Sequence, residues 1–338
     1  MSLASILERA WSKRGLLALT LLPFAFVFAL LAWSRRALFR LGLLRSHRLA
    51  APVVVVGNIS VGGTGKTPLA IWLAESLRRR GFRPGVISRG YGGSATGPRR
   101  VSPDDDAAVV GDEPLLIARR TGVPVWIGAD RVEAGRGLLR ENPGCDLLIS
   151  DDGLQHYRMR RSVEIVVLNR SALGNGWPLP AGPLREPLGR LTTADAVVLI
   201  GATPLARSMA VRLPRRFEAV VTGDRFHRLG CPADVRTVAQ LKGLKLHAIA
   251  GIGNPRRFFD HLAGLGLEFI PHSFPDHHRY RSGELEFEDC DAILMTEKDA
   301  VKFVQLPSCD AWVLPVAAVV MPDLADFILE KINGRQAA

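Results

Sequence analysis

The sequence has few cysteines and few aromatic residues. Only four of its 338 residues are cysteines, and they lie far apart with no Cys-x-x-Cys pair among them. This spacing argues against a zinc site or a disulfide framework. Aromatic residues make up 7% of the chain and form no ladder interleaved with Lys and Arg, such as single-stranded nucleic-acid binders use. We therefore expect no nucleic-acid partner, and nothing in the sequence indicates a protein partner.

The charge balance of the chain is basic. Lys and Arg outnumber Asp and Glu by 44 to 33, which gives a net charge of +11. Anionic surfaces attract such a chain, so lipid headgroups and phosphorylated substrates are candidate partners. The length and the 47% hydrophobic content are sufficient for two globular domains, and no internal repeat or low-complexity linker interrupts them.

An apolar segment without charge runs from Gly15 to Ser34. At a helical rise of about 1.5 Å per residue its twenty residues would span about 30 Å, the thickness of a bilayer core. No small-x-small cleavage site ends the segment, and Arg35 and Arg36 follow it directly, so we expect a retained membrane anchor with the remaining chain in the cytoplasm. Pro23 removes a backbone donor and can kink the helix, which leaves a full span and an interfacial helix both open.

A glycine-rich loop follows a β-branched run in "VVVVGNISVGGTGKTPLAIWLAESL". The order of strand, loop and helix is that of a Walker A loop, although Ser60 stands where the strict pattern begins with Gly. Backbone N–H groups of such a loop surround phosphate oxygens, the lysine binds phosphate, and the hydroxyl after it ligates Mg²⁺. The residues that we expect to bind the nucleotide are Gly62, Gly63, Thr64, Gly65, Lys66 and Thr67.

Two carboxylates follow a buried apolar run in "CDLLISDDGLQHYRM". A phosphate-loop enzyme needs a magnesium-side carboxylate at the end of a neighbouring strand, so Asp151 and Asp152 are candidate Walker B acids. Asp-Asp-Gly is also a common turn sequence, and one of the two can merely begin the turn. The sequence leaves open which carboxylate meets the metal.

Several other motifs are ambiguous when each is taken alone. Asp112 of "GDEP" suits a helix N-cap as well as catalysis, and Arg185 of "LPAGPLREP" suits a connector as well as a substrate rim. Residues 251–253, Gly-Ile-Gly, lack the third glycine of a dinucleotide fingerprint, so a packing turn is preferred there. The histidines of "DHH", residues 276–278, lack the spacing of a metal site.

Taken together, eight motifs resemble those of the tetraacyldisaccharide 4'-kinase family in content and order. They are "GNISVGGTGKTP", "SRGYGG", "GDEP", "SDDGLQHYRM", "GNGWPLPAGPLREP", "AGIGNPRRFF", "DHH" and "MTEKDAVK". The resemblance implies a kinase that uses ATP and Mg²⁺. Its acceptor would be the 4'-hydroxyl of an acylated glucosamine disaccharide 1-phosphate, at the cytoplasmic face of the inner membrane. The product would be the lipid A precursor.

The resemblance also implies roles for individual residues. Asp112 would be the catalytic base, oriented by His277, because a sugar hydroxyl is a poor nucleophile and a carboxylate within reach can take its proton. Lys66 would hold the phosphates during transfer. The implied metal-side residues are Thr67, Asp151, Asp152 and Glu113, and the implied substrate-side residues are Arg131, Gln155, His156 and Arg185.

Three other functions compete with this interpretation. A membrane-associated partition-type ATPase has a similar loop, but its signature lysine before the two glycines is replaced here by Val61. A signalling GTPase would carry Asn-Lys-x-Asp, which is absent. A non-catalytic membrane scaffold leaves the phosphate loop unexplained.

The expected fold is α/β and has three parts. Residues 1–48 form the membrane-associated helix and its basic flank. Residues 49–220 form a P-loop kinase domain with a mainly parallel sheet and helices on both faces. Residues 221–338 form a smaller α/β domain that contributes His277 across the cleft.

Overall fold

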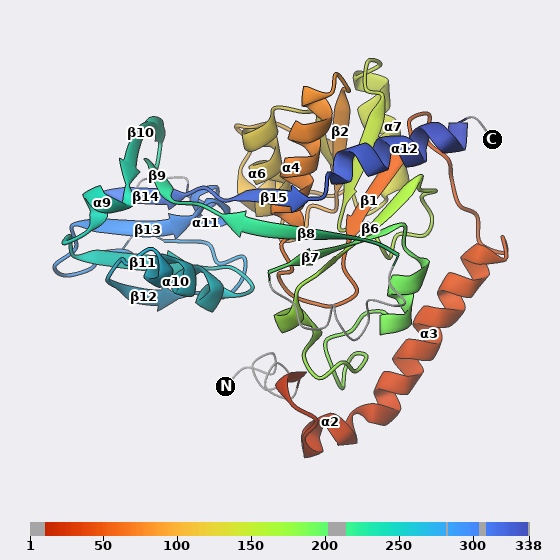
Figure 1. Cartoon of the computed structure of the whole chain (residues 1–338), viewed down its shortest axis with the longest axis horizontal. Helices are drawn as coiled ribbons and strands as arrows, with labels where there is room; N and C mark the ends of the chain where they lie inside the picture. Colours follow the sequence, from red (N-terminus) through yellow and green to blue (C-terminus); the bar gives the residue numbers. More distant parts are fainter. Residues whose placement is uncertain (1–10, 202–213, 282, 304–308, 337–338) are drawn as a thin grey trace.

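Two β-sheets, placed side by side, organise the protein (Figure 1). The computed structural model describes residues 11–201, 214–281, 283–303 and 309–336. Within these residues, nine strands form the first sheet and six form the second. The first sheet belongs to the larger domain, and the second sheet forms the core of a smaller domain beside it.

The first sheet is mainly parallel, as predicted. Its strands lie in the order β15-β8-β7-β6-β1-β5-β2-β4-β3, and only the two outermost strands pair in the antiparallel sense. The carboxyl ends of the parallel strands therefore meet at one edge, where ligands bind in open α/β sheets. The strands are β1 (Val53–Gly57), β2 (Pro84–Ser88), β3 (Arg99–Val101), β4 (Val125–Ile127), β5 (Leu147–Asp151), β6 (Val163–Leu168), β7 (Ala196–Ile200), β8 (Arg215–Thr222) and β15 (Ala317–Met321).

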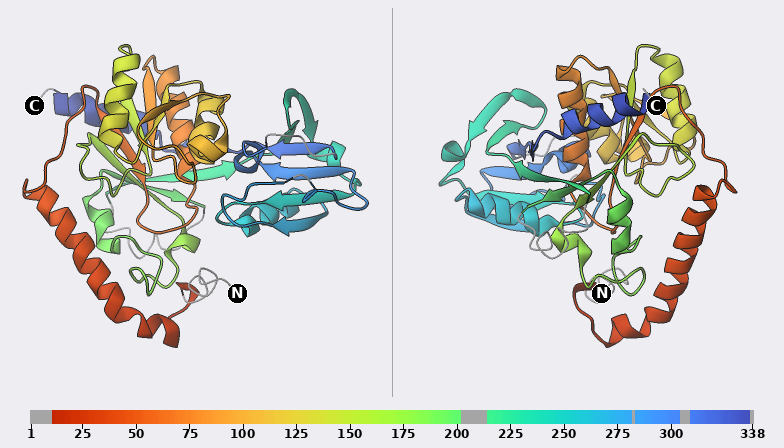
Figure 2. Two further views of the ribbon diagram at one scale, coloured as in Figure 1. Left: turned by 180° about the vertical axis from the view of Figure 1, so that it is seen from behind. Right: turned by 45° about the vertical axis from the view of Figure 1, so that its right-hand side comes forward.

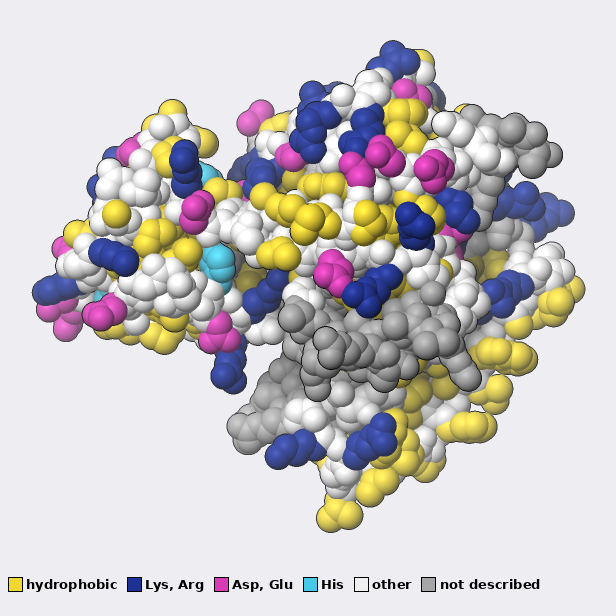
Figure 3. Space-filling view, viewed as in Figure 1, with side chains coloured by type: hydrophobic (Ala, Val, Ile, Leu, Met, Phe, Trp, Pro, Cys, Tyr) yellow, Lys and Arg dark blue, Asp and Glu magenta, His cyan; other side chains and the backbone are white. Residues whose placement is uncertain are grey.

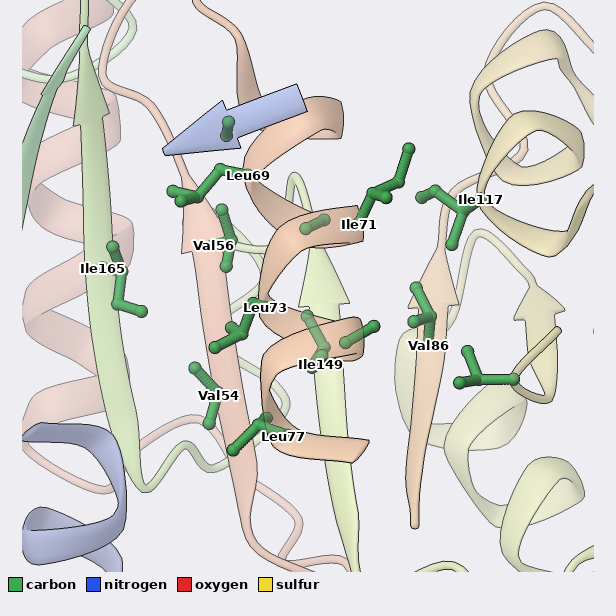
Figure 4. Packing of buried hydrophobic residues seen from close by; sticks show 14 of the residues in the cluster. Val54, Val56, Leu69, Ile71, Leu73, Leu77, Val86, Ile117, Ile149 and Ile165 are labelled. Carbon is green, nitrogen blue, oxygen red and sulfur yellow. The ribbon is translucent and has the colours of Figure 1, made fainter. Parts of the chain in front are cut away.

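Helices cover both faces of this sheet. The valines of β1 alternate between two cores, because successive side chains of a strand point to opposite faces. Val54 and Val56 pack with α4 (Lys66–Arg79), α6 (Asp112–Thr121) and α12 (Leu324–Gln336), as Figure 4 shows for α4. The other two inner valines of β1 pack with α7 (Arg131–Glu141) on the opposite face. Three short helical turns complete the domain, at α5 (Ala107–Val110), η1 (Arg170–Leu173) and η2 (Leu188–Thr193).

The second sheet also has a parallel centre. The strand order is β10-β9-β14-β13-β11-β12, and β11, β12, β13 and β14 are parallel to one another. The strands are β9 (Arg225–Arg228), β10 (Cys231–Thr237), β11 (Leu246–Ala250), β12 (Phe269–Ser273), β13 (Ala292–Thr296) and β14 (Ala311–Leu314). The helices of this domain are α9 (Val238–Leu241), α10 (Pro255–Gly264) and α11 (Glu297–Ala300). Apolar residues of α10 pack on one face, and the loops around residues 274–290 cover the other.

The end of the chain returns to the first domain, which differs from the expected second domain of residues 221–338. Strand β15 pairs antiparallel with β8, and α12 packs its apolar residues against the core of the first sheet. Strand β8 runs on to Thr222 and leads into the second domain, so two strands connect the domains (Figures 1 and 2). The expected boundary near residue 220 lies at the end of β8, where the chain first leaves the first domain. It does not include the return of the chain at β15, because that return depends on pairing between segments about a hundred residues apart.

The apolar N-terminal segment forms two helices, α2 (Leu16–Thr20) and α3 (Leu22–Arg40). Pro23 lies in the first turn of α3, where its missing N–H is not needed, so the break precedes the proline. Helix α3 is long and apolar enough to cross a membrane, and very little of it is buried against the protein. Its exposed apolar side chains form the yellow row at the lower right of Figure 3.

Replacement of Leu73 by alanine will measure how much the core that contains Val54 and Val56 stabilises the packing of α4 on β1. Leu73 is fully buried, so we expect Leu73→Ala to lower the free energy of unfolding by about 2–5 kcal/mol. Leu30 of α3 is half exposed, and Leu30→Ala is the matched control, with an expected change within about 0.5 kcal/mol. Urea unfolding followed by circular dichroism compares the two, and equal losses would contradict the assignment of the core.

Candidate active site

The phosphate loop connects β1 to α4 at the carboxyl edge of the first sheet. Gly62 and Gly65 have φ of +95° and +88°, values that side chains rarely adopt. A Cβ atom at Gly65 would also lie 2.5 Å from Cδ1 of Ile200, so a larger residue there would force the end of that side chain to move. All six predicted nucleotide-binding residues, 62–67, line a cavity of about 1010 Å³ between the two domains.

Lys66 and Asp152 meet at the floor of this cavity. Lys66 Nζ lies 3.2 Å from Asp152 Oδ1, and Arg185 Nη1 lies 3.3 Å from Asp152 Oδ2. Burial alone would raise the pKa of Asp152, but the charges of Lys66 and Arg185 outweigh burial and lower the pKa. Asp152 also has a φ of +48°, an unfavourable backbone conformation that its position at the end of β5 imposes.

Asp151 is buried beside this pair, and the nearby charges of Lys66 and Arg131 do not outweigh the effects of burial and of its acidic neighbours. Its Oδ1 atom has no hydrogen-bond partner among the described residues. Burial, together with the nearby charges of Glu113 and Asp152, raises its pKa to about 7. A buried carboxylate with surplus negative charge around it is stabilised by a cation.

These groups fit a magnesium ion. No cluster of three or more His, Cys, Asp or Glu residues within the described chain forms a metal cage. Mg²⁺ in kinases needs no such cage, because one or two carboxylates together with water and substrate phosphates suffice. Asp151 meets this requirement by its unpaired oxygen, and Thr67 and Glu113 line the adjoining cavity.

Asp112 and His277 are brought together from the two domains. Asp112 is the first residue of α6 and is 4% exposed, and its Oδ1 atom lies 2.8 Å from His277 Nδ1. The carboxylate thus accepts a hydrogen bond from the ring. Burial opposes ionisation of Asp112, but His277 and Lys298 more than offset burial and lower the pKa of the carboxyl. Asp112 is therefore ionised at neutral pH, and Gly111 rather than Asp112 is the N-cap of α6.

His277 occupies a strained position in the loop after β12. Its φ is +60°, and its ring lies 5.1 Å from that of Tyr91, in an edge arrangement. A Cβ atom at Gly92 would lie 3.1 Å from His277 Nδ1, so the "SRGYGG" loop must be small here for the ring to reach Asp112. The neighbouring His278 turns to Glu284 instead, with 2.9 Å between Nε2 and Oε2, and takes no part in the site.

Sequence reasoning missed a lysine that joins the domains. Lys298, in the short helix α11, lies 3.1 Å from Glu113 Oε1, 3.2 Å from Asp276 Oδ1 and 3.6 Å from Asp112 Oδ2. Its pKa is raised because three carboxylates outweigh the effect of burial. The motif "MTEKDAVK" contains this lysine, but nothing in the local sequence indicates its distant partners.

The predicted substrate-side residues surround the cavity. Arg131 is buried at the start of α7, where its Nη2 atom donates to the backbone carbonyl of Asp152 at 3.4 Å. Gln155 donates to Asn58 O at 3.0 Å and to Glu186 Oε1 at 2.8 Å. His156 is held neutral, because burial and the charge of Arg131 lower its pKa to about 4.

The arrangement unites nearly all of the predicted residues. Arg131, Gln155, His156 and Arg185 line the cavity together with the phosphate loop, Glu113, Asp152 and His277. Asp112 and Asp151 are buried directly behind these residues. The cavity thus combines a phosphate loop, a buried acid suited to a metal, and an ionised carboxylate held by a histidine. This combination can transfer phosphate to an acceptor whose proton the carboxylate takes.

Comparisons with known proteins agree with this geometry. A family model described as tetraacyldisaccharide-1-P 4'-kinase matches residues 17–333. The tetraacyldisaccharide 4'-kinase of Azoarcus sp. (strain BH72) is 49% identical over 97% of this chain and 96% of its own length. The tetraacyldisaccharide 4'-kinase of Aromatoleum aromaticum is 49% identical over 97% of this chain and 98% of its own length. The crystal structure of LpxK from Aquifex aeolicus in complex with ATP is 28% identical, with a TM-score of 0.78 over 94% of this chain and 99% of that one. The chain belongs to the tetraacyldisaccharide-1-P 4'-kinase family.

Proposed function

We propose that this protein transfers the γ-phosphate of ATP to the 4'-hydroxyl of a tetraacylated glucosamine disaccharide 1-phosphate. The product is the bis-phosphorylated lipid A precursor. The observation that carries the proposal is the Asp112–His277 pair, which meets at 2.8 Å beside the cavity that the phosphate loop lines. Family membership and the likeness to an ATP-bound relative support ATP as the donor.

Asp112 acts as the general base. His277 occupies one carboxylate oxygen, Oδ1, and fixes the orientation of the group. The other oxygen, Oδ2, accepts no hydrogen bond from the described residues, and its nearest cations are Lys298 Nζ at 3.6 Å and Lys302 Nζ at 4.0 Å. This oxygen accepts the proton of the sugar hydroxyl as the hydroxyl attacks the γ-phosphorus. Lys66 and the backbone of residues 62–65 hold the phosphates in line for transfer.

Asp151, Asp152, Thr67 and Glu113 are the residues that would hold Mg²⁺. When bound, the ion neutralises charge that develops on the phosphate oxygens. Asp151 is the best suited as a direct ligand, because Asp152 already pairs with Lys66 and Arg185. Arg131, Gln155, His156 and Arg185 line the remaining wall, where the anionic disaccharide enters.

The N-terminal helices bind the surface of the inner membrane. Near the start of the segment, Trp11 Nε1 donates to Pro180 O at 2.9 Å. Near its end, Arg35 donates to Gln155 O at 3.0 Å and Arg36 to Thr193 Oγ1 at 2.7 Å. Both ends therefore contact the same domain. A spanning helix would place its ends on opposite sides of the bilayer, so this segment lies in the interface with its apolar side chains in the lipid.

The kinase domain lies on the cytoplasmic face. Arginines flank the apolar segment, and the greater number follows it, as is typical of the cytoplasmic side. Anionic headgroups attract the same arginines, at about 1 kcal/mol for each residue close to the surface. Confinement to the surface raises the local concentration of a lipid acceptor that does not leave the bilayer.

Product analysis tests the reaction directly. We expect incubation with ATP, Mg²⁺ and the disaccharide 1-phosphate to yield a lipid that carries one additional phosphate, located at the 4' position by mass spectrometry and ³¹P NMR. Lys66→Ala should abolish this transfer, because the lysine is the phosphate-binding cation of the loop. Hydrolysis of ATP without any phosphorylated lipid would support a partition-type ATPase and refute the proposal.

Replacement of the base separates chemistry from binding. We expect Asp112→Asn to lower kcat by about a hundredfold or more, because proton transfer to a positioned group contributes this much. ATP affinity and the midpoint of thermal unfolding should stay close to those of the wild type. Turnover equal to that of the wild type would exclude the base role.

Labelling of both ends of the N-terminal segment distinguishes an interfacial helix from a span. Lys13 and Arg45 are exposed and lie on either side of the apolar helices. In sealed inner-membrane vesicles with the cytoplasmic face outward, we expect a membrane-impermeant maleimide to label both Lys13→Cys and Arg45→Cys. Labelling of the native cysteines in the wild type provides the background. If position 13 reacts only after the vesicles are opened, the helix spans the bilayer.

A further inference from the structure

The loop between β11 and α10 lies against the phosphate loop. A Cβ atom at Gly253 would lie 3.3 Å from the backbone N of Gly63 and 3.2 Å from Asp276 Oδ2. The glycine therefore allows the backbone of the second domain to approach the backbone of the first very closely. The packing turn expected at residues 251–253 packs against the nucleotide loop.

The first turn of α10 carries Arg257 into this contact. Asn254 caps the helix, and its Oδ1 atom accepts a hydrogen bond from the backbone N–H of Arg257 at 3.3 Å. The guanidinium extends toward the phosphate loop, and its Nη1 atom lies 3.9 Å from the position that a Cβ would take at Gly65. Arg257 thus lines the same cavity as residues 62–67, from the opposite domain.

The charge of Arg257 is not balanced by protein groups. No carboxylate pairs with its guanidinium within the described part of the chain, although the side chain is half-buried. Burial without a compensating anion lowers the pKa of this arginine. The neighbouring Arg256 differs, because its side chain is 88% exposed and lies 3.6 Å from Asp260. A half-buried cation without an anion is costly unless a ligand supplies one.

We propose that Arg257 is a ligand of the polyphosphate of ATP, contributed by the second domain. The proposal rests on the proposed function and adds a cation that faces Lys66 across the phosphate loop. A guanidinium presents a planar set of donors that matches phosphate oxygens in pairs, which a lysine does not. In other phosphate-loop enzymes, an arginine supplied from outside the phosphate loop stabilises the charge of the transferring phosphoryl group. ATP binding then draws the two domains together.

The test compares Arg257 with its exposed neighbour. Binding of ATP, ADP and AMP is measured by titration calorimetry, without lipid, for the wild type, Arg257→Ala, Arg257→Lys and the control Arg256→Ala. We expect Arg257→Ala to weaken ATP binding by about tenfold to a hundredfold, the usual effect of losing a charge-assisted hydrogen bond. AMP binding should change less than about twofold by the same reasoning, because the lost contact is to the outer phosphates. Arg257→Lys should recover part of the loss, and Arg256→Ala should match the wild type.

Two kinds of result would overturn the proposal. One is an unchanged ATP affinity in Arg257→Ala. The other is an equal loss for ATP and AMP, or a lowered midpoint of thermal unfolding, since either would indicate a structural role. If Arg257 bound the 1-phosphate of the lipid instead, Arg257→Ala would leave ATP binding unchanged and would raise the KM for the lipid. Because the titrations need no acceptor, failure of the wild type to phosphorylate lipid would refute the proposed function alone.

Discussion

The hydrogen bond between Asp112 and His277 is the contact on which the site depends, because its two partners belong to different domains. Asp112 sits at the start of α6, where the helix dipole favours a negative charge, and it stays buried and ionised only while cations of the second domain face it. Lys298 supplies one of these cations and also contacts Glu113. The protonation state and orientation of Asp112, the proposed base, thus depend on groups of the second domain. The strands β8 and β15 pair with each other, and both connect the two domains.

The charges of the cavity leave groups of both signs without an ion-pair partner among the described residues. Asp152 is neutralised by Lys66 and Arg185, and Glu113 by Lys298. Asp151 on one side and Arg257 on the other have no such partner among the described residues. A nucleotide bound with a divalent cation would complement both, since the metal meets the acid and the phosphates meet the arginine. Without substrates these unpaired charges are electrostatically unfavourable. Pairing them with nucleotide and metal would release free energy that offsets the cost of bringing two domains onto one ligand.

Local sequence was sufficient for the parts of the site that are continuous in the chain. The phosphate loop needs glycines at positive φ directly before a helix, and the Walker B acids need a buried strand directly before them, so both are visible within a dozen residues. The resemblance to a family was required for Asp112 and His277, because each taken alone suits a helix terminus or an exposed loop. Lys298 and the return of β15 to β8 were not predictable in this way. Both depend on contacts between segments that only the folded topology brings together, and neither leaves a periodic or compositional signal.

The apolar helix α3 and the nucleotide cavity share a wall, which bears on how the proposed lipid acceptor would reach the site. Arg35 of α3 lines the cavity and donates to the backbone carbonyl of Gln155, and the Gln155 side chain in turn bonds to Glu186. In the proposed interfacial arrangement, the apolar side chains of α3 lie in the lipid and its cationic end lies at the rim of the cavity. In that arrangement, an acceptor embedded beside α3 would have its acyl chains in the membrane and its sugar headgroup near the level of Arg35. The protein rather than diffusion would then set the distance between the headgroup and the phosphate loop, so the proposed anchor would also help to position the substrate.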